Sequence, residues 1–179
     1  MFTHLNVVSH YSLRYGVAAP EEIVDFAVQN DMQTVALTDR DGLYGAVRFA
    51  QACMDADVNP IIGCNLPLQN SGIEIAAPMV GQASLDLKPA RFTAIASGYG
   101  GMVGLNRLVS AHHEVGVDHN VVRRVCEITQ ETNSGNLSIL LGPNSDLGRA
   151  IFEKQFTHAK RILDVWRSTG ADIYCEIVS

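Results

Sequence analysis

Several features that assign a sequence to a specialised class of protein are missing here. No unbroken apolar run among the 179 residues approaches the length of a membrane span, so no membrane association is expected. The first residues hold no basic stretch followed by an apolar one, so no secretory signal is expected. The four cysteines form no CxxC pair and no short Cys/His spacing, which excludes the common zinc-finger patterns. We therefore expect a cytoplasmic protein with reduced, mostly buried cysteines.

Positive charge is also scarce. Lysine and arginine together number 13 against 19 aspartates and glutamates, which gives a formal net charge of −6. A surface that follows nucleic acid needs clustered basic residues to displace counterions, whereas the basic residues here are dispersed. Direct nucleic-acid binding by this chain should therefore be weak or absent. Hydrophobic residues make up 47% of the chain, which is typical of a globular protein, and the length suits a single domain.

Short β-rich runs alternate with helical patterns along the chain. Strands are expected at residues 2–8, 34–38, 60–64, 92–96, 137–141 and 173–178, with an extra short strand at 73–77 in a long excursion. Helices are expected from residue 20, from residue 43 to about 57, after residue 101, at 121–129 and around 163–166. The polar stretch at 116–120 should connect two of these helices.

Two of the expected helices carry an apolar stripe that should face the core. In the first, Ile23, Phe26 and Ala27 lie on one face. In the second, the recurring residues are Leu43, Ala46, Val47, Ala50 and Met54. The glycines at 98, 100 and 101 lack the G-x-G-x-x-G spacing and the Walker lysine of phosphate-binding loops, and we interpret them as a turn before a helix.

About six strand–helix units with apolar strands favour parallel strands covered by helices. A barrel of the (β/α) type fits this pattern, and its ligands would lie at the carboxyl ends of the strands. The last residues are still strand-like, and an open barrel would leave an unpaired edge. The edge would then be covered by a partner or by a second copy, or the chain is a fragment of a longer protein.

Three segments in register resemble one known family. They are residues 2–16 (FTHLNVVSHYSLRYG), residues 36–49 (ALTDRDGLYGAVRF) and residues 60–65 (PIIGCN). The first is similar to the opening motif of the PHP (polymerase and histidinol phosphatase) domain in bacterial DNA polymerase III alpha subunits, which are C-family polymerases. The others are similar to its "A-L-T-D-H-G-x-x-x-G-A-V-x-F" and "P-I-I-G-C-E". The resemblance implies a single PHP-like domain over residues 1–179, a (β/α)7-type barrel truncated before its last unit or units.

The resemblance also implies a metal cluster, and this sequence departs from it. The family holds two or three divalent ions, Zn, Mn or Mg, with His, Asp, Glu and Cys at the strand ends. At the equivalent positions this sequence has Asn6, Val8, Tyr15, Arg40, Asn65, Arg91 and Pro143. Valine and proline offer no lone pair, and arginine is neither an acceptor nor deprotonated in proteins. We therefore expect no metal cofactor and no catalytic residue.

A residual pocket would contain His4, His10, Asp39, Arg40 and Arg91. The two histidines either recruit a stray metal ion or only form hydrogen bonds. Asp39 follows an expected strand, where barrel active sites lie, but capping of the next helix or an ion pair with Arg40 is the favoured interpretation. The two arginines either pair with nearby aspartates or bind an anion.

The adjacent pair His112 and His113 should not share an ion, because neighbouring side chains on a helix point about 100° apart.

The resemblance favours a catalytically degenerate PHP-like domain of a polymerase used in replication or error-prone synthesis. Its role would be structural or partner-docking, with other polymerase domains or replisome subunits as partners. One alternative is a free-standing metal-dependent PHP phosphoesterase or 3′–5′ exonuclease. Another is a module that binds an anion or a nucleotide through its arginines.

Overall fold

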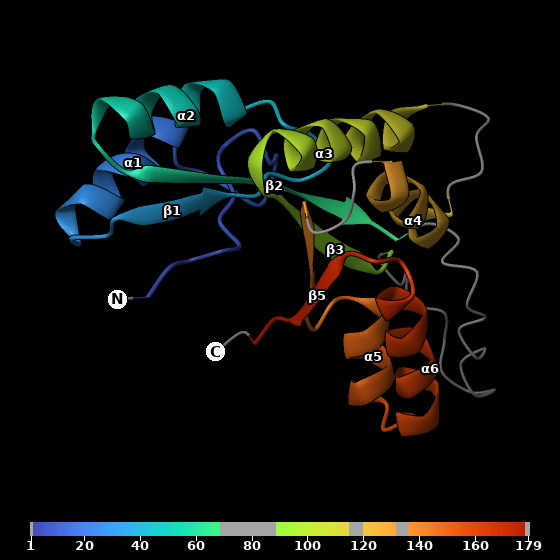
Figure 1. The fold of residues 1–179 in the computed structure, drawn as a ribbon. Helices are drawn as coiled ribbons and strands as arrows, with labels where there is room; N and C mark the ends of the chain where they lie inside the picture. Colours follow the sequence, from blue (N-terminus) through green and yellow to red (C-terminus); the bar gives the residue numbers. More distant parts are fainter. Residues whose placement is uncertain (1, 69–88, 115–119, 132–135, 178–179) are drawn as a thin grey trace.

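The computed structural model of the chain describes residues 2–68, 89–114, 120–131 and 136–177 (Figure 1). The strands form one sheet: β1 (Thr34–Leu37), β2 (Asn59–Pro67), β3 (Arg91–Ala96), β4 (Leu137–Leu141) and β5 (Asp172–Cys175). The helices are α1 (Pro20–Gln29), α2 (Ala46–Asp55), α3 (Gly98–His113), α4 (Val121–Glu131), α5 (Asp146–Phe152) and α6 (Phe156–Arg167). The expected α/β fold class is confirmed. The strand expected at 73–77 and the polar stretch from 116 to 119 lie outside the described residues.

The strands are ordered β1-β2-β3-β4-β5 across the sheet. β1 pairs with β2 and β4 pairs with β5 in parallel, whereas β3 is antiparallel to both of its neighbours. Four strands thus run in one direction and β3 runs in the other, which corrects the expectation of uniformly parallel strands. Antiparallel neighbours need no crossover helix between them, and the sequence between β2 and β3 indeed shows no helical periodicity.

The strand expected at residues 2–8 is not formed, although this segment lies beside β1. The amides of Ala36 and Thr38 donate to the carbonyls of His4 and Val7, at 3.3 and 2.7 Å. The amide of Val7, however, donates to the Thr38 hydroxyl at 3.0 Å instead of to a backbone carbonyl. A side chain therefore replaces the backbone acceptor and interrupts the ladder. The described strands form one open sheet, and closure into a seven-unit barrel stays a prediction.

The buried faces of the first two helices differ in part from the apolar stripes expected from the sequence. In α1 the buried apolar residues include Ile23 and Ala27, but the Phe26 side chain is exposed. α2 begins at Ala46 and not at Leu43, so its buried positions fall at 46, 49 and 53, with the usual spacing of three and four. The expected stripe began at residue 43 and included Val47 and Met54. Both of these residues are exposed.

The glycines near residue 100 lie inside α3, and not in a turn before it as expected. Gly98 is the first helical residue, with φ at +62°. A Cβ on Gly101 would lie 2.0 Å from the carbonyl oxygen of Asn136, so glycine at this position lets the helix approach the start of β4 closely. Helix α5 was not predicted; the side chain of Ser145 caps it by accepting from the amide of Gly148.

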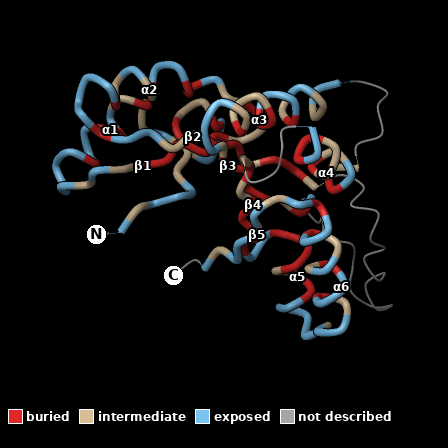
Figure 2. The backbone as a smooth tube through the Cα atoms, in the orientation of Figure 1, coloured by how far each residue is buried: buried red, intermediate tan, exposed pale blue. Residues whose placement is uncertain are grey.

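Two hydrophobic clusters form the core, and Figure 2 shows the buried backbone gathered along the sheet and the adjoining helix faces. The larger cluster joins the helices from α3 onward to β2, β3 and β4. At its centre the rings of Phe92 and Trp166 pack with centroids 5.4 Å apart. The smaller cluster lies between α1, α2 and β1 around Phe49. None of the described helices is both long and apolar enough to cross a membrane.

Candidate functional site

One cleft lies where the parallel strands end, and every position that the resemblance assigns to a metal ligand lines it. Its volume is about 380 Å³. The seven positions that line it are Asn6, Val8, Tyr15, Arg40, Asn65, Arg91 and Pro143. Residues from the first 15 positions and from beyond position 140 thus meet at one place.

The direction of the strands explains this convergence. Arg40 follows β1, Asn65 lies near the end of β2, and Pro143 follows β4, so these residues sit at the carboxyl ends of strands that run the same way. Arg91 is the first residue of β3. Because β3 is antiparallel to β2 and β4, its beginning lies at the edge where the other strands end. The reversed strand therefore delivers its arginine to the same cleft.

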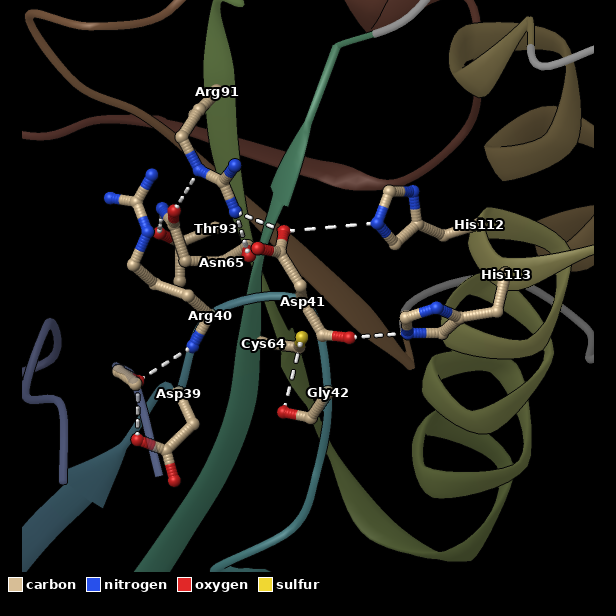
Figure 3. A network of polar contacts seen from close by, with 11 residues as sticks. Asp39, Arg40, Asp41, Gly42, Cys64, Asn65, Arg91, Thr93, His112 and His113 are labelled. Carbon is tan, nitrogen blue, oxygen red and sulfur yellow. Dashed lines mark hydrogen bonds and ion pairs between the residues drawn. The ribbon is translucent and has the colours of Figure 1, made fainter. Parts of the chain in front are cut away.

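Arg91 is held in a fixed position by a network of short polar contacts (Figure 3). Its Nε donates to Asn65 Oδ1 at 2.6 Å, and its Nη2 donates to the Asn65 carbonyl at 2.7 Å and to Asp41 Oδ1 at 2.5 Å. Asn65 Nδ2 in turn donates to the hydroxyl of Thr93 at 2.9 Å. The Arg91 side chain is only 11% exposed. A charge-assisted network of this kind fixes the guanidinium plane and leaves Nη1 directed away from these partners.

Asp41 connects this network to the end of α3. Its backbone has φ at +60°, and its carbonyl oxygen lies 2.5 Å from His113 Nε2. Its carboxylate lies 3.8 Å from His112 Nε2 as well as beside Arg91. The adjacent histidines His112 and His113 therefore both contact Asp41, which is the ion-pair partner of Arg91. No local signal points to this contact, because it depends on how α3 packs on the sheet.

Arg40 is the second cation of the cleft. Its guanidinium carbon lies 3.7 Å from the centre of the Tyr15 ring, a cation–π contact. Partial burial, followed by the positive charge of Arg91, lowers the pKa of the Arg40 guanidinium from its ordinary value. The Arg40 backbone amide donates to the Ser12 hydroxyl at 2.9 Å. The Arg40 side chain forms no ion pair or hydrogen bond with the described residues.

Asp39 follows β1 and points away from Arg91. The expectation that it caps α2 or pairs with Arg40 is wrong. Its Oδ1 accepts from the amide of Ser9 at 2.7 Å and from the hydroxyl of Ser12 at 2.7 Å. The hydroxyl of Ser9 donates to its Oδ2 at 2.8 Å. Asp39 as a residue is only 2% exposed. Because buried carboxylates need such donors, we interpret Asp39 as the anchor of the loop after residue 8.

The two histidines assigned to the residual pocket lie elsewhere. The ring of His10 packs on Tyr11 with centroids 4.5 Å apart, and it does not line the cleft. His4 packs edge-on against Phe2 and lines a separate groove. Of the five residues predicted for a residual pocket, the structure therefore brings together only Arg40 and Arg91.

The residues of the cleft do not fit a divalent metal cluster. Its only carboxylate is that of Glu176, and no three His, Cys, Asp or Glu side chains are grouped as metal ligands in the described part of the chain. Two guanidinium groups face the place where cations would bind. At an effective dielectric constant of about 20, they would repel a divalent ion by several kcal/mol.

Sequence reasoning missed Glu176 as a residue of the cleft. It follows β5, and its Oε1 accepts from Asn6 Nδ2 at 2.8 Å. A Cβ on Gly142 would lie 2.5 Å from its Oε2, so the glycine makes room for this carboxylate. A signal was present, because Glu176 lies in the second half of the last expected strand, toward its carboxyl end. Asn144 is a second missed lining residue.

A second hollow adjoins the cleft on the sheet face that the described helices leave uncovered. In β4, Ile139 and Leu141 point into the core, whereas Ser138 and Leu140 line this groove, as the two-residue period of a strand requires. Its volume is about 660 Å³. The apolar side chains that line it include Phe2, Leu5, Ile61, Ile95, Leu140, Tyr174 and Ile177.

Comparison with known families assigns the chain. The profile of the family described as "PHP domain" matches residues 4–179. The chain belongs to the PHP domain family.

The curated relatives of this PHP domain include bacterial DNA polymerases. It is 33% identical over 141 residues to an error-prone DNA polymerase of Mycolicibacterium paratuberculosis, an alignment covering 79% of this chain and 12% of that protein. It is 27% identical over 174 residues to DNA polymerase III subunit alpha of Buchnera aphidicola, covering 97% of this chain and 14% of that protein. The resemblance stated from the three motifs is thus confirmed. The chain spans about an eighth of the length of these relatives.

Among solved structures, this PHP domain is similar to an amidohydrolase from Chromobacterium violaceum. The TM-score is 0.47 and the sequence identity is 12%, with 97% of this chain and 87% of that chain covered.

Proposed function

We propose that this PHP domain is a catalytically degenerate module of a bacterial C-family DNA polymerase, where it supports the fold of the polymerase or docks its partners. The observation that carries the proposal is the composition of the cleft. Seven positions that the family uses for metal ligands line it, and they hold two arginines, two asparagines, a valine, a tyrosine and a proline. The family membership and the polymerase relatives supply the context.

Metal-dependent phosphoester hydrolysis needs metal ions that lower the pKa of a bound water and clamp the phosphate. The described side chains of this cleft offer no set of ligands for such metal ions, because only Glu176 among them has a carboxylate. The alternative of a free-standing phosphoesterase or exonuclease therefore receives no support from the site. We assign catalysis, in any parent protein, to segments other than this chain.

The docking role is supported by the uncovered groove. β5 lies at the edge of the described sheet, and its side chains are largely exposed. Tyr174 is 54% exposed and Ile177 is 94% exposed, beside a groove of about 660 Å³. An apolar sheet face next to an unpaired edge is a surface that a further polypeptide segment covers. We propose that the partners are other polymerase domains or replisome subunits, in the cytoplasm. When these partners are absent, a second copy of the chain would cover the groove.

Metal content tests the degenerate site. The chain is purified without chelator, dialysed against zinc and manganese, passed through a gel-filtration column and analysed for its elements. We expect less than about a tenth of an equivalent of either metal. A positive control carries the ligands of the family motifs, with Asn6→His, Val8→His, Arg40→His and Asn65→Glu combined. Two or more equivalents retained by the unaltered chain would contradict the proposal, and phosphoesterase activity would then be measured.

Sedimentation velocity tests the docking surface. We expect the isolated chain to self-associate with increasing concentration, because none of the described helices or strands covers the groove. Ile177→Lys should weaken that association, since it places a charge beside the groove. Val47→Lys is the matched control, because Val47 is 81% exposed on α2 and does not line the groove. A monomer at all concentrations, with no binding of an apolar fluorescent dye, would contradict a docking role for this face.

A further inference from the structure

The cleft contains guanidinium donors that form no hydrogen bond with the described residues. The hydrogen bonds of the Arg91 side chain involve Nε and Nη2, so the two N–H groups of Nη1 have no partner among the described residues. None of the N–H groups of the Arg40 guanidinium donates to a described residue either. A guanidinium presents five N–H donors in a planar fork that matches the oxygens of phosphate. We infer that Arg40 and Arg91 together form a binding site for a small phosphate-bearing anion, either free phosphate or the phosphate group of a nucleotide.

The electrostatics of the cleft favour such an anion. The charge of Arg91 is one of the causes that lower the pKa of Arg40, so the two cations oppose one another in the unliganded protein. An anion between them would turn this repulsion into two attractions. The chain as a whole has a formal charge of −6, so a bound phosphate would report this local pair and not a general attraction for anions.

Both guanidiniums are oriented before any ligand arrives. Arg91 is held by Asn65 and Asp41 (Figure 3). Arg40 is stacked on the ring of Tyr15. Donors that are already oriented lose little conformational entropy on binding. Asp41 offsets part of the charge of Arg91, so Arg40 should contribute more of the affinity.

The negative charge of Glu176 decides where in the cleft the anion lies. Its carboxylate lines the same cleft and accepts from Asn6. It would repel a phosphate, so we place the anion at the Arg40 end, between the two guanidiniums. The cleft volume of about 380 Å³ lies in the range of small-ligand sites.

This inference goes beyond the proposed function, because it assigns a ligand to the degenerate cleft. The two guanidiniums would clamp a phosphate where relatives with the family motif hold metal ions. Without a metal-activated water, the cleft would bind a phosphate ester and leave it intact.

A titration with phosphate under chelating conditions tests the inference. Thermal unfolding of the chain is followed in EDTA while inorganic phosphate replaces sodium chloride at constant ionic strength. We expect the unfolding temperature to rise with phosphate concentration, since a ligand of the folded state stabilises it by mass action. Deoxyadenosine monophosphate should protect at least as well, whereas deoxyadenosine, which lacks the phosphate, should not protect.

Three variants test whether the arginine pair is the place where phosphate binds. Arg40→Gln should weaken the apparent phosphate affinity by about tenfold or more, which corresponds to one charge-assisted contact. Arg123→Gln is the matched control, because it removes an equal charge from an exposed position on α4 and should leave the affinity unchanged. Glu176→Gln keeps an acceptor for Asn6 and removes the opposing charge, so it should raise the affinity severalfold.

If Arg40→Gln does not fold, the gain in phosphate affinity expected for Glu176→Gln still tests the inference. The inference would be overturned if phosphate stabilised Arg40→Gln and Arg123→Gln as much as the unaltered chain. It would also be overturned if phosphate did not raise the unfolding temperature of the unaltered chain at all. Neither result would affect the proposed function, which depends on the metal content. Conversely, tight metal binding would contradict the proposed function. It would not affect the phosphate titration, because EDTA prevents metal ions from bridging phosphate to the protein.

Discussion

Asn6 Nδ2 donates a hydrogen bond of 2.8 Å to Glu176 Oε1, which joins residues 170 positions apart in the chain. Both residues line the cleft, and both also line the apolar groove beside it. The pair therefore forms part of the border between the two hollows. It also connects the segment beside β1 with the residues that follow β5, the two ends of the described sheet.

Glu176→Ala should loosen the segment at residues 2–8. The segment is held to β1 by the amides of Ala36 and Thr38, which donate to the carbonyls of His4 and Val7. We expect these two amides to exchange with deuterium several times faster in the variant, because their acceptors lose the anchor at Asn6. Glu153→Ala, at an exposed position after α5, is the control. Unchanged exchange would mean that the Asn6 contact does not hold the segment.

Asp39→Ala should reduce the free energy of unfolding by about 3 kcal/mol, because the buried donors of Ser9 and Ser12 would lose their acceptor. Urea unfolding followed by circular dichroism measures this. Asp25→Ala, on the exposed side of α1, should change the stability by less than about 0.5 kcal/mol. Equal effects of the two substitutions would show that the carboxylate of Asp39 is not an anchor.

Asp146 should make the stability depend on pH. Burial raises the pKa of its carboxyl above the ordinary value of 3.8, although the Leu147 amide and the Trp166 indole donate to it. The folded state therefore holds this proton more tightly than the unfolded state does. Its contribution to stability is full below pH 3.8 and is lost as the pH rises through the raised pKa.

Asp146→Asn removes this titration while keeping an oxygen that accepts from Trp166. Urea unfolding of both proteins across the acidic range should show the variant gaining stability relative to the original as the pH rises above 3.8. A stability difference that stays constant with pH would contradict the raised pKa of Asp146.

Gly101→Ala should destabilise the protein although alanine favours helices by about 1 kcal/mol over glycine. The added Cβ would lie 2.0 Å from the backbone oxygen of Asn136, and backbone yields little. We expect a net loss of about 2 kcal/mol in urea unfolding. Ser110→Ala, at an exposed position of the same helix, should be neutral or slightly stabilising. A gain at position 101 would mean that α3 does not approach β4 so closely.

The thiols should react with a disulfide reagent at very different rates. Burial raises the pKa of Cys64 to about 12 and that of Cys53 to about 11, so neither forms a thiolate at pH 8. Cys175 is exposed. We expect the thiol of Cys175 to react fastest in the folded chain, in a phase that Cys175→Ser removes. The half-buried Cys126 should react more slowly, and Cys53 and Cys64 only after unfolding. Rapid labelling of either buried thiol would contradict the packing around it.

Side-chain chemistry and local periodicity determined much of this protein from the sequence alone. Strands such as β4 and helices such as α4 could be placed because apolar spacing is a short-range property. The substitutions at the ligand positions, such as Val8 and Pro143, could be read because valine and proline cannot bind a metal in any fold. The family motifs supplied the correct family.

Only the tertiary structure decided the direction of β3 and the choice of partner for each charged side chain. Asp39 is bonded to serines and not to Arg40, whereas Arg91 is paired with Asp41. Such choices depend on distances between residues from different strands, which no local pattern contains. The same holds for Glu176, which reaches the cleft only because β5 pairs with β4 in one register. Residue chemistry limits what each side chain can bind, and the pairing of distant strands selects which of those partners lies within reach.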